Sequence, residues 1–577
     1  MNNKTKQIIV VVSVFVLALA SLGTVIGLLV SAGRLSEYSN GFSYTLSGTR
    51  ATITGYDGDD TDVVVPDKVR GNRVVSVAKD AFKSKASEIK TITFKSNSSF
   101  TFEDEAFQNL TALEKVVLPS SLKEIPDGAF SGCKALQKVI IPDSVTRIGD
   151  EAFKNCSALV FAYKSEDYST EGENAIDEEI FYMPSGLLEI GSSAFESCTS
   201  MIGTHFNKVL EKVGEDAFSK AAALTELTLD EDCELASIGN GAFQDTKLSS
   251  TSNNLLEFPH LTSIGDRAFA NVTTNFRQFK IPATVKSIGT NALMGCTSLS
   301  YVFFEEDIEL ESMGEGVFLD CTVLENIGLV GKENNTITSY QLPNSLKAIP
   351  AKTFMGCSRL LYSHNFKIGK NVEEIGDGAF AIYSKSTSYA TRDRALEVDE
   401  ENENFAIVNL QKFSKKGNTS TYSHGLLTNA DYTEVYAYFG SYDTNSYFGE
   451  KISNNETEED ARVGETFGFY DTDGIWTTSI STIKAYAFAG VAFNDIRLPK
   501  TVESIGEYVF YNSEILEMST EAIGWKWEKT SFSKKDDGDP EVSVSILQTG
   551  NGTFAEKQDF AYLLSEDNIY AYVGLPN

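Results

Sequence analysis

Histidine is scarce in this sequence of 577 residues: there are only four, and they stand far apart. Scattered histidines give no local zinc-binding pattern and no His-based catalytic motif. Basic side chains are also few, since 49 Lys and Arg face 81 Asp and Glu, for a formal net charge of -32. Nucleic-acid binders need clustered Lys and Arg to contact phosphate, so this balance argues against that class. Seven Cys are too few for a disulfide scaffold.

Catalytic motifs are missing as well. The chain has no Gly-rich phosphate loop, no Gly-x-Ser-x-Gly elbow and no His-Glu-x-x-His motif. Paired carboxylates occur throughout so acidic a chain and therefore single out no catalytic pair. We expect no enzymatic activity and no cofactor. The acidic cluster at 57–62 lacks the Gly and the distal Glu of an EF-hand loop, so solvated turns explain it better than a Ca²⁺ site.

A run of 23 uncharged residues, Ile8 to Val30, stands near the N-terminus. A helix rises about 1.5 Å per residue, so this run is long enough to cross a hydrocarbon core of about 30 Å. Two lysines precede the run, and the positive-inside rule then predicts a single-pass plasma-membrane protein whose bulk is extracellular. A cleaved signal peptide is the alternative, because 18–20 and 30–32 resemble cleavage sites.

Internal repetition dominates the rest of the chain. The stretches 113–133, 136–156 and 299–321 share an alternating apolar triplet, a Gly or Pro step, then Ala-Phe or Val-Phe, then Cys. The phenylalanine of this pattern, here called the landmark, recurs mostly at intervals of 22 to 26 residues. Its positions are Phe82, Phe107, Phe130, Phe153, Phe195, Phe218, Phe243, Phe269, Leu293 (a substitution), Phe318, Phe354, Phe380, Phe488 and Phe510.

The repeat predicts one short strand and one tight turn per coil. Strand alternation points Val116 inward and Lys115 outward, and Pro119 ends the strand because it has no N–H for the ladder. The landmark segment is expected to form a short helical turn that places Phe in the core. A single coil cannot bury its own apolar face, so coils must stack. The predicted fold is a repeat solenoid, mostly β with short helical turns: a leucine-rich-repeat stack of about fourteen coils behind one N-terminal transmembrane helix.

These repeats resemble the BspA-type (treponemal-type) leucine-rich repeat of bacterial and some protist surface proteins. The stretch 42–77 looks like the N-terminal module of that family, and 396–440 is similar to a degenerate hairpin unit found within it. The resemblance implies a cell-surface binding role rather than a chemistry. It covers roughly 42–515 and lapses at 160–185, 330–342 and 381–480.

The repeats and their interruptions predict a sequence of segments along the chain. They are a cytoplasmic N-terminus (1–7), a transmembrane signal anchor (8–30), a linker (31–41), an N-terminal cap (42–78), the repeat solenoid (79–380), a Tyr-rich β insertion (381–480), resumed repeats (481–520) and a C-terminal cap (521–577). Caps are expected because the open core of a terminal coil needs a lid. For 521–577, a separate small interaction domain is the alternative.

Six cysteines share one register, three residues after the landmark: Cys133, Cys156, Cys198, Cys296, Cys321 and Cys357. Equal register means an equal place in successive coils, so we expect a structural ladder of buried, reduced thiols beside backbone groups. Disulfides between neighbouring coils are the alternative. Stacked Cα atoms about 5 Å apart meet the distance range for that bond, although parallel side-chain vectors disfavour it.

Two surfaces are candidates for partner binding. The outward face of the stacked strands is predicted to display basic and aromatic side chains: Lys115, Lys138, Arg277, Lys280, Tyr301 and Phe303. An acidic or glycan ligand would suit this face, and a merely solvated sheet face is the alternative. The Tyr-rich insertion offers Tyr432, Tyr436 and Tyr438 on one side of a strand. Tyrosine supplies contact area at low entropic cost, although ordinary strand packing explains this pattern equally well.

The sequence therefore predicts a membrane-anchored extracytoplasmic protein that binds a macromolecular surface ligand, protein or glycan, as an adhesin or binding module. The alternative is a structural envelope protein that self-assembles. Its high negative charge would oppose lateral packing unless divalent cations bridged the copies.

Overall fold

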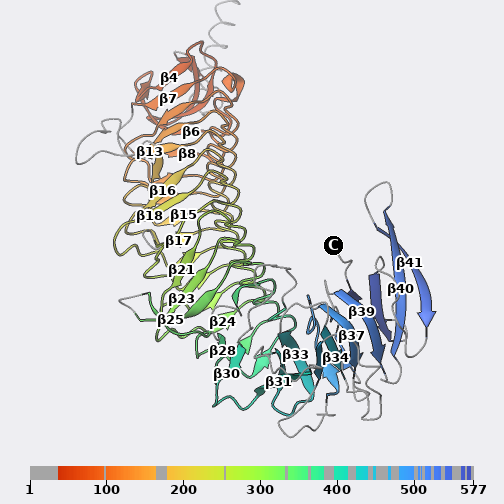
Figure 1. Cartoon of the computed structure of the whole chain (residues 1–577). Helices are drawn as coiled ribbons and strands as arrows, with labels where there is room; N and C mark the ends of the chain where they lie inside the picture. The colour runs from red at the N-terminus through yellow and green to blue at the C-terminus, as the bar shows by residue number, and fades with distance from the viewer. Residues whose placement is uncertain are drawn as a thin grey trace, which may run out of the picture. The chain divides into compact units, whose positions relative to one another are not determined.

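The computed structural model forms a β-solenoid of about 12 turns with almost no helix (Figure 1). It describes 41–95, 99–163, 179–251, 255–331, 335–360, 366–381, 396–413, 424–439 and 480–490, together with further short stretches, mainly strands, between 37 and 573. The chain forms two compact units, Met1–Lys247 and Leu248–Asn577. The predicted membrane segment 8–30 lies outside the described residues. No helix within the described part is both long and apolar enough to cross a bilayer.

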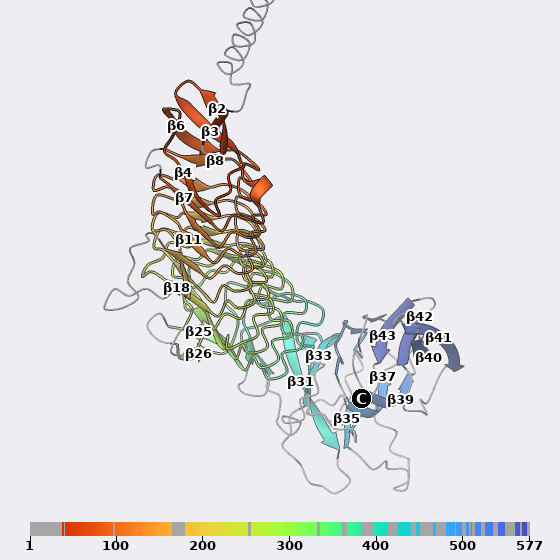
Figure 2. The same cartoon turned by 90° about the horizontal axis from the view of Figure 1, so that it is seen from above.

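The coils of unit 1 build two parallel sheets from short strands (Figure 2). The front sheet contains, in order, β4 (Asp62–Val65), β7 (Thr91–Phe94), β9 (Lys115–Val117), β11 (Lys138–Ile140), β13 (Phe161–Tyr163), β14 (Ile180–Tyr182), β16 (Gly203–Phe206) and β18 (Glu226–Leu229). The side sheet contains the two-residue strands β10 (Glu124–Ile125), β12 (Arg147–Ile148), β15 (Glu189–Ile190), β17 (Lys212–Val213) and β19 (Ser237–Ile238). Parallel register keeps equivalent positions of successive coils side by side.

Unit 1 begins with a separate sheet that covers the first coil. Its order is β1 (Glu37–Ser39), β2 (Phe42–Ser47), β3 (Arg50–Tyr56), β6 (Asn72–Val77) and β5 (Lys68–Val69), and β8 (Thr101–Phe102) pairs with β6. Phe42 and Tyr56 pack with ring centroids 4.8 Å apart, and Tyr56 lies 6.0 Å from the first landmark, Phe82. These rings close the open end of the core.

The landmark phenylalanines form a continuous stack of rings inside unit 1. Ring centroids lie 5.0 Å apart between Phe107 and Phe130 and 5.3 Å apart between Phe130 and Phe153, with planes 7° apart in both pairs. Phe218 and Phe243 stack in the same way, at 5.3 Å and 3°. Burying each ring between two others is what a single coil cannot do for itself, so the core exists only in the stacked state.

The landmark turns are not helical, so the prediction of short helical turns is wrong. The backbone N–H groups of Gly128, Phe130 and Gly132 donate to carbonyls of the next coil at 2.7, 2.7 and 2.8 Å, which removes them from any intrahelical bonding. Gly128 and Gly132 have φ of 62° and 76°. Left-handed residues on both sides of the landmark break an α-helix. The turn therefore makes a third hydrogen-bonded side of the coil. The single 3₁₀ helix among the described residues is η1 (Lys83–Lys85).

The number of turns is also smaller than the predicted fourteen. Phe82, the first landmark, packs against the rings of the N-terminal sheet as well as against Phe107. Phe510, the last landmark, lies outside the described residues.

The interruption at 160–185 adds a strand without disturbing the core. In the side sheet, β12 pairs directly with β15, whereas in the front sheet β13 and β14 both stand between β11 and β16. Phe153 and Phe195, the landmarks on either side, still stack at 5.3 Å. The extra strand therefore widens only the front sheet.

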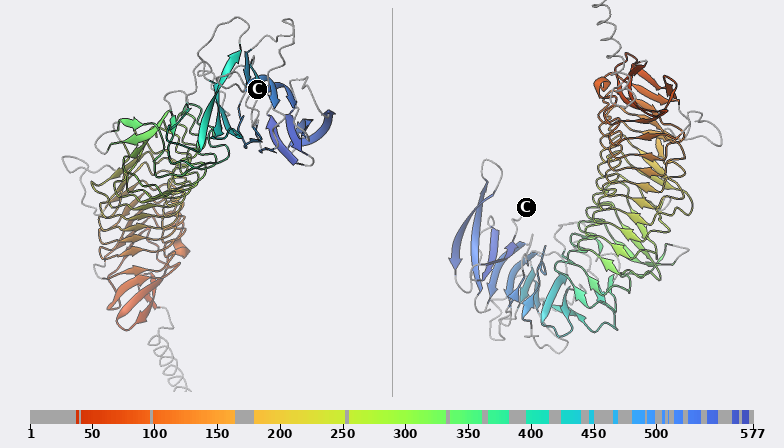
Figure 3. Two further views of the ribbon diagram at one scale, coloured as in Figure 1. Left: turned by 90° about the horizontal axis from the view of Figure 1, so that it is seen from below. Right: turned by 180° about the vertical axis from the view of Figure 1, so that it is seen from behind.

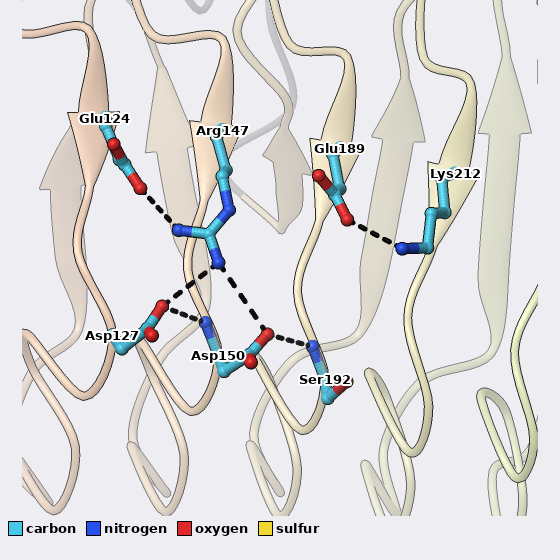
Figure 4. A network of polar contacts seen from close by, with 7 residues as sticks. All are labelled: Glu124, Asp127, Arg147, Asp150, Glu189, Ser192 and Lys212. Atoms are coloured by element: carbon cyan, nitrogen blue, oxygen red, sulfur yellow. Dashed lines mark hydrogen bonds and ion pairs between the residues drawn. The ribbon is translucent and has the colours of Figure 1, made fainter.

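A ladder of aspartates joins neighbouring coils along the side of unit 1 (Figure 4). Asp127 Oδ1 accepts a hydrogen bond from the backbone N–H of Asp150 at 2.8 Å, and Asp150 Oδ1 accepts one from Ser192 N–H at 2.8 Å. Arg147 bridges Glu124, Asp127 and Asp150. The side chain of one coil thus satisfies a backbone donor of the next.

Unit 2 repeats this plan (Figure 3). Its front sheet contains β21 (Gln278–Ile281), β23 (Tyr301–Glu305) and β25 (Asn326–Val330) in parallel, closed by the antiparallel β26 (Ile337–Ser339). Its side strands are β20 (Ser263–Ile264), β22 (Ser287–Ile288) and β24 (Ser312–Met313), followed by the pair β27 (Ala348–Ile349) and β29 (Glu374–Ile375). Phe318 and Phe354 stack at 5.6 Å and 5°, across the long interval that contains β26.

The Tyr-rich segment continues the stacking where it is described. β30 (Leu396–Val398) pairs in parallel with β28 (Phe366–Ile368), and β33 (Glu434–Phe439) pairs in parallel with β36 (Thr482–Ile483). Between them, β31 (Phe405–Phe413) and β32 (His424–Asn429) form an antiparallel hairpin. The final strands, β41 (Pro540–Gln548), β40 (Trp525–Lys534), β42 (Phe560–Ser565) and β43 (Asn568–Val573), form an antiparallel sheet in that order.

Candidate ligand-binding site

The outward face of the unit 1 front sheet carries registered rows of side chains. Lys115 and Lys138 are direct partners on β9 and β11, and both are half-buried. Farther along the sheet, the rings of Tyr182 and His205 lie 5.6 Å apart. His205 Nδ1 lies 2.9 Å from Thr228 Oγ1 and its Nε2 lies 3.2 Å from Asp230 Oδ1. The predicted lysines thus lie on one face, and aromatic side chains lie elsewhere on it.

The front sheet of unit 2 has a concave site of about 460 Å³ on its outward face. The strands β21, β23 and β25 supply its floor through Gln278, Tyr301, Phe303 and Asn326. The segment 335–340, which contains β26, supplies Thr336, Ile337 and Tyr340. This volume falls within the range of roughly 300–1,000 Å³ for small-molecule sites. The site is here called the β23 pocket.

Strand register explains how the floor of the β23 pocket forms. Gln278, Tyr301 and Asn326 occupy the same position on three neighbouring strands. Two residues later, Phe303 pairs with Gly328 on β25. A Cβ atom on Gly328 would lie 2.2 Å from Ser339 O and 2.6 Å from Ile337 Cγ2. Glycine at this position therefore lets β26 fold closely onto the outward face.

Two aromatic rings lie side by side in the β23 pocket. The ring centroids of Tyr301 and Phe303 are 5.9 Å apart and their planes differ by 29°. Tyr301 is 36% exposed, whereas Phe303 is only 3% exposed. The pair presents an aromatic surface that is open at the tyrosine end.

The polar groups of the floor have no partner within the protein as described. Asn326 is 4% exposed, and its side chain forms no hydrogen bond to any described residue. The carboxamide of Gln278, at the same register position two strands away on β21, is likewise unpaired among those residues. Amide groups that line a concave site and pair with no described residue are available to bind an outside partner.

The predicted basic residues near this pocket do not make it cationic. Lys280 Nζ lies 3.1 Å from Glu305 Oε1 and 3.5 Å from Glu257 Oε1, and the lysine side chain is 9% exposed. Its charge is therefore offset within the sheet. Arg277 is exposed and stands outside the lining of the β23 pocket.

The three predicted tyrosines of the insertion do not form one exposed face. Tyr438 is buried, and its ring lies 5.9 Å from that of the landmark Phe488. Tyr436 donates a 2.6 Å hydrogen bond to Glu434, which also pairs with Lys484 at 3.0 Å. Burial and this carboxylate raise the pKa of Tyr436 well above its usual value. Tyr432 alone of the three predicted tyrosines is exposed, at 41%. The described strand thus uses Tyr436 and Tyr438 for packing.

All seven cysteines are buried free thiols. The six cysteines of the predicted ladder each donate a hydrogen bond to the carbonyl oxygen of the landmark residue in the preceding coil, at 3.0 to 3.2 Å. Cys233, which stands outside that register, donates in the same way to Asn207 O at 3.2 Å. The thiols thus satisfy backbone acceptors rather than form a reactive centre.

Sequence reasoning named Tyr301 and Phe303 but missed Gln278, Asn326, Thr336 and Tyr340. Two signals were available. Asn326 follows a landmark turn at the same distance as Tyr301 does, and the interval from Phe318 to Phe354 is 36 residues long. The extra residues of that interval form the second side of the pocket.

No metal centre appears in the described part of the chain. Among those residues, no group of three or more His, Cys, Asp or Glu side chains could hold a metal ion. The polar groups that come together in the β23 pocket are amides and hydroxyls, which bind rather than transfer protons at neutral pH.

A family model for a repeat matches the part of the chain that forms the stacked coils. The model for the BspA type leucine rich repeat region matches six copies, over 70–160, 173–260, 250–335, 332–444 and 471–563. The chain belongs to the BspA-type leucine-rich repeat family. Leucine-rich repeat families are in general binding modules without enzymatic activity, and they generally bind protein ligands.

Several solved structures are similar to part of this chain. A leucine-rich repeat protein from Bacteroides ovatus is 19% identical, with a TM-score of 0.39 over 60% of this chain and 91% of its own. A leucine rich cell surface protein from Faecalibacterium prausnitzii is 20% identical, with a TM-score of 0.34 over 60% of this chain and 86% of its own. A T. pallidum leucine-rich repeat protein is 20% identical, with a TM-score of 0.30 over 46% and 91%. No curated protein matches the chain.

Proposed function

We propose that this BspA-type protein is a surface-displayed binding module, an adhesin in the broad sense. Residues 8–30 hold it in the plasma membrane as a single-pass anchor, and the repeats lie outside the cell. The uncharged length of 8–30 and the preceding lysines support this placement. Its partner is a macromolecule presented on another surface.

The β23 pocket carries this proposal. It brings an exposed tyrosine, a second aromatic ring and unpaired amides together on the outward face of a sheet whose inward face is core. Convergent polar groups in an aromatic-lined concavity are the usual features of a ligand site. Repeat proteins present such sites on a rigid scaffold, so little ordering entropy is lost on binding.

Two experiments test the proposal. Protease treatment of intact cells should remove the repeats while cytoplasmic markers survive, and full protection of the repeats would contradict surface display. The full chain should then be applied to arrays of immobilised matrix proteins and glycans, with Tyr301→Ala beside the wild type. We expect capture by at least one ligand and a loss of capture in the variant. The absence of any capture would overturn the binding role.

A separate experiment tests the alternative role, that of a self-assembling envelope protein. Sedimentation of the full chain in detergent with and without Ca²⁺ separates the two roles, because a self-assembling envelope protein of this charge would need cations to pack laterally. We expect a sedimentation coefficient that is independent of Ca²⁺. Calcium-dependent growth in size would favour the structural role instead.

A further inference from the structure

We propose that the β23 pocket binds one sugar unit of a neutral saccharide. This inference rests on the proposed binding function and narrows it to a ligand class. It depends on three features of the pocket: its aromatic rings, its unpaired amides and its lack of charge.

The aromatic rings suit the apolar face of a sugar ring. A pyranose presents C–H groups on one face and hydroxyls around its edge, so it packs flat against an aromatic ring while its edge stays polar. Tyr301 and Phe303 form a paired ring surface with centroids 5.9 Å apart, and the tyrosine end is accessible. An aliphatic floor would offer burial without the attraction between C–H groups and the ring face.

The amides suit the edge of the same ring. A carboxamide carries one acceptor and two donors, which matches the mixed donor and acceptor character of sugar hydroxyls. Asn326 and Gln278 stand on either side of Tyr301, one strand away in each direction. Their side chains line the pocket and have no partner among the described residues. Hydroxyl groups at both edges of a bound sugar would satisfy them.

The charge of the site indicates a neutral ligand. Every side chain that lines the β23 pocket is uncharged, and Lys280, on the strand that also carries Gln278, is paired with Glu257 and Glu305. The formal charge of the whole chain is -32, which repels uronic acids, sialic acids and sulfated sugars.

An extended peptide fits the pocket less well. Peptides that bind sheets add a strand to a free edge. Here β26 already pairs with β25 through Leu329 with Ser339 and Val330 with Ile337. The unpaired groups of the floor are side-chain amides on the face of the sheet, not the backbone groups of a sheet edge.

Calorimetric titration tests the inference directly. The full chain, in a detergent without a sugar headgroup, is titrated with maltohexaose, cellohexaose, mannohexaose and xylohexaose. We expect at least one of these probes to bind, and we expect Tyr301→Ala and Asn326→Leu each to weaken its binding about tenfold or more. Tyr182→Ala is the matched control: it removes a half-buried tyrosine beside a ring, on the front sheet of the other unit, and should change the affinity less than about twofold.

A thermal melt separates binding from folding. Asn326→Leu removes an amide that pairs with no described residue, so its melting temperature should stay close to that of the wild type while binding is lost. Tyr301 is partly exposed, so its truncation tests binding even if the Asn326 variant misfolds.

Three results would overturn the inference. The first is that none of the four saccharides binds; if the arrays still capture a protein ligand, the proposed function survives without it. The second is saccharide binding that neither variant weakens, because the site would then lie elsewhere. The third is a captured peptide that depends on Tyr301 while no saccharide does, because the pocket would then serve a different ligand class.

Discussion

The Sγ atom of Cys156 donates a hydrogen bond to the carbonyl oxygen of Phe130, 3.1 Å away in the preceding coil. The bond places a thiol against a backbone acceptor in a fully buried position, so ionisation would put an uncompensated charge in the core. Burial accordingly raises the pKa of Cys133 to about 12 and that of Cys156 well above its usual value. These cysteines are therefore structural, and their reactivity in the native state should be very low.

Alkylation should distinguish folded from unfolded thiols. Iodoacetamide at pH 8 is expected to leave the cysteines of the native chain unmodified, because neither access nor thiolate is available. In urea all seven should react, as counted by mass spectrometry. Rapid modification of Cys133 or Cys156 under native conditions would contradict the burial of the ladder.

Stability should fall on the alkaline side because of the same thiols. An unfolded thiol has a pKa of about 8.5, so above that pH the unfolded chain releases protons that the folded chain retains. The stabilisation is complete below about pH 8.5 and is lost as pH rises towards 12, at up to about 1.4 kcal/mol per pH unit for each thiol. Urea midpoints at pH 7.5, 8.5 and 9.5 with reductant measure the slope. A Cys133→Ala, Cys156→Ala chain should show a shallower slope, and an unchanged slope would assign the effect to other groups.

The aspartate ladder provides a test of coupling between coils. Asp127 Oδ1 accepts both the Asp150 N–H at 2.8 Å and an Arg147 N–H at 3.1 Å (Figure 4). Asp127→Ala loses both bonds and should lower the free energy of unfolding by about 1 kcal/mol. Asp127→Asn keeps an oxygen for the backbone donor and loses only the exposed ion pair, so it should cost roughly half as much. Chemical denaturation in low and high salt compares them, and equal costs would show that the backbone bond contributes nothing.

The repeating part of the fold could be predicted because each coil carries the same constraints. Phenylalanines that recur at a regular spacing in the sequence stack ring on ring in the structure. The alternation around Val116 correctly separates core residues from surface residues. The turns were predicted less well. Their Ala-Phe pattern looks helical, but the hydrogen bonds run between coils, and a single repeat read alone does not show the neighbour that accepts them.

The β23 pocket depends on an irregularity and was therefore only partly predictable. Tyr301 and Phe303 follow from strand alternation. Asn326 lines the pocket because it lies beside Tyr301 and is covered by a segment that the repeat does not contain. Lys280 is not available to a ligand because it pairs with Glu305. A periodic pattern predicts which residues share a row, but not what folds over that row.

The landmark position should tolerate leucine better than alanine. Phe153 stacks between Phe130 and Phe195 at 5.3 Å on each side. Phe153→Ala leaves a cavity between two rings and should cost roughly 3–5 kcal/mol. Phe153→Leu should cost about 1–1.5 kcal/mol, because Leu293 occupies a landmark position naturally and is fully buried. Urea unfolding of the full chain measures both, and equal costs would mean that the site relaxes around a small side chain.

Gly328 is the position where a single methyl group should disturb the β23 pocket. An added Cβ would lie 2.2 Å from Ser339 O, a backbone atom that moves only if β26 moves. We expect Gly328→Ala to lower the free energy of unfolding by about 1–3 kcal/mol and to speed hydrogen exchange across 337–339. Gly331→Ala is the matched control in the same hairpin, because a Cβ there meets nothing within 4 Å. The control should stay within about 0.5 kcal/mol of the wild type. If both variants exchange at the wild-type rate, the close packing of β26 onto the sheet is not what holds this side of the pocket in place.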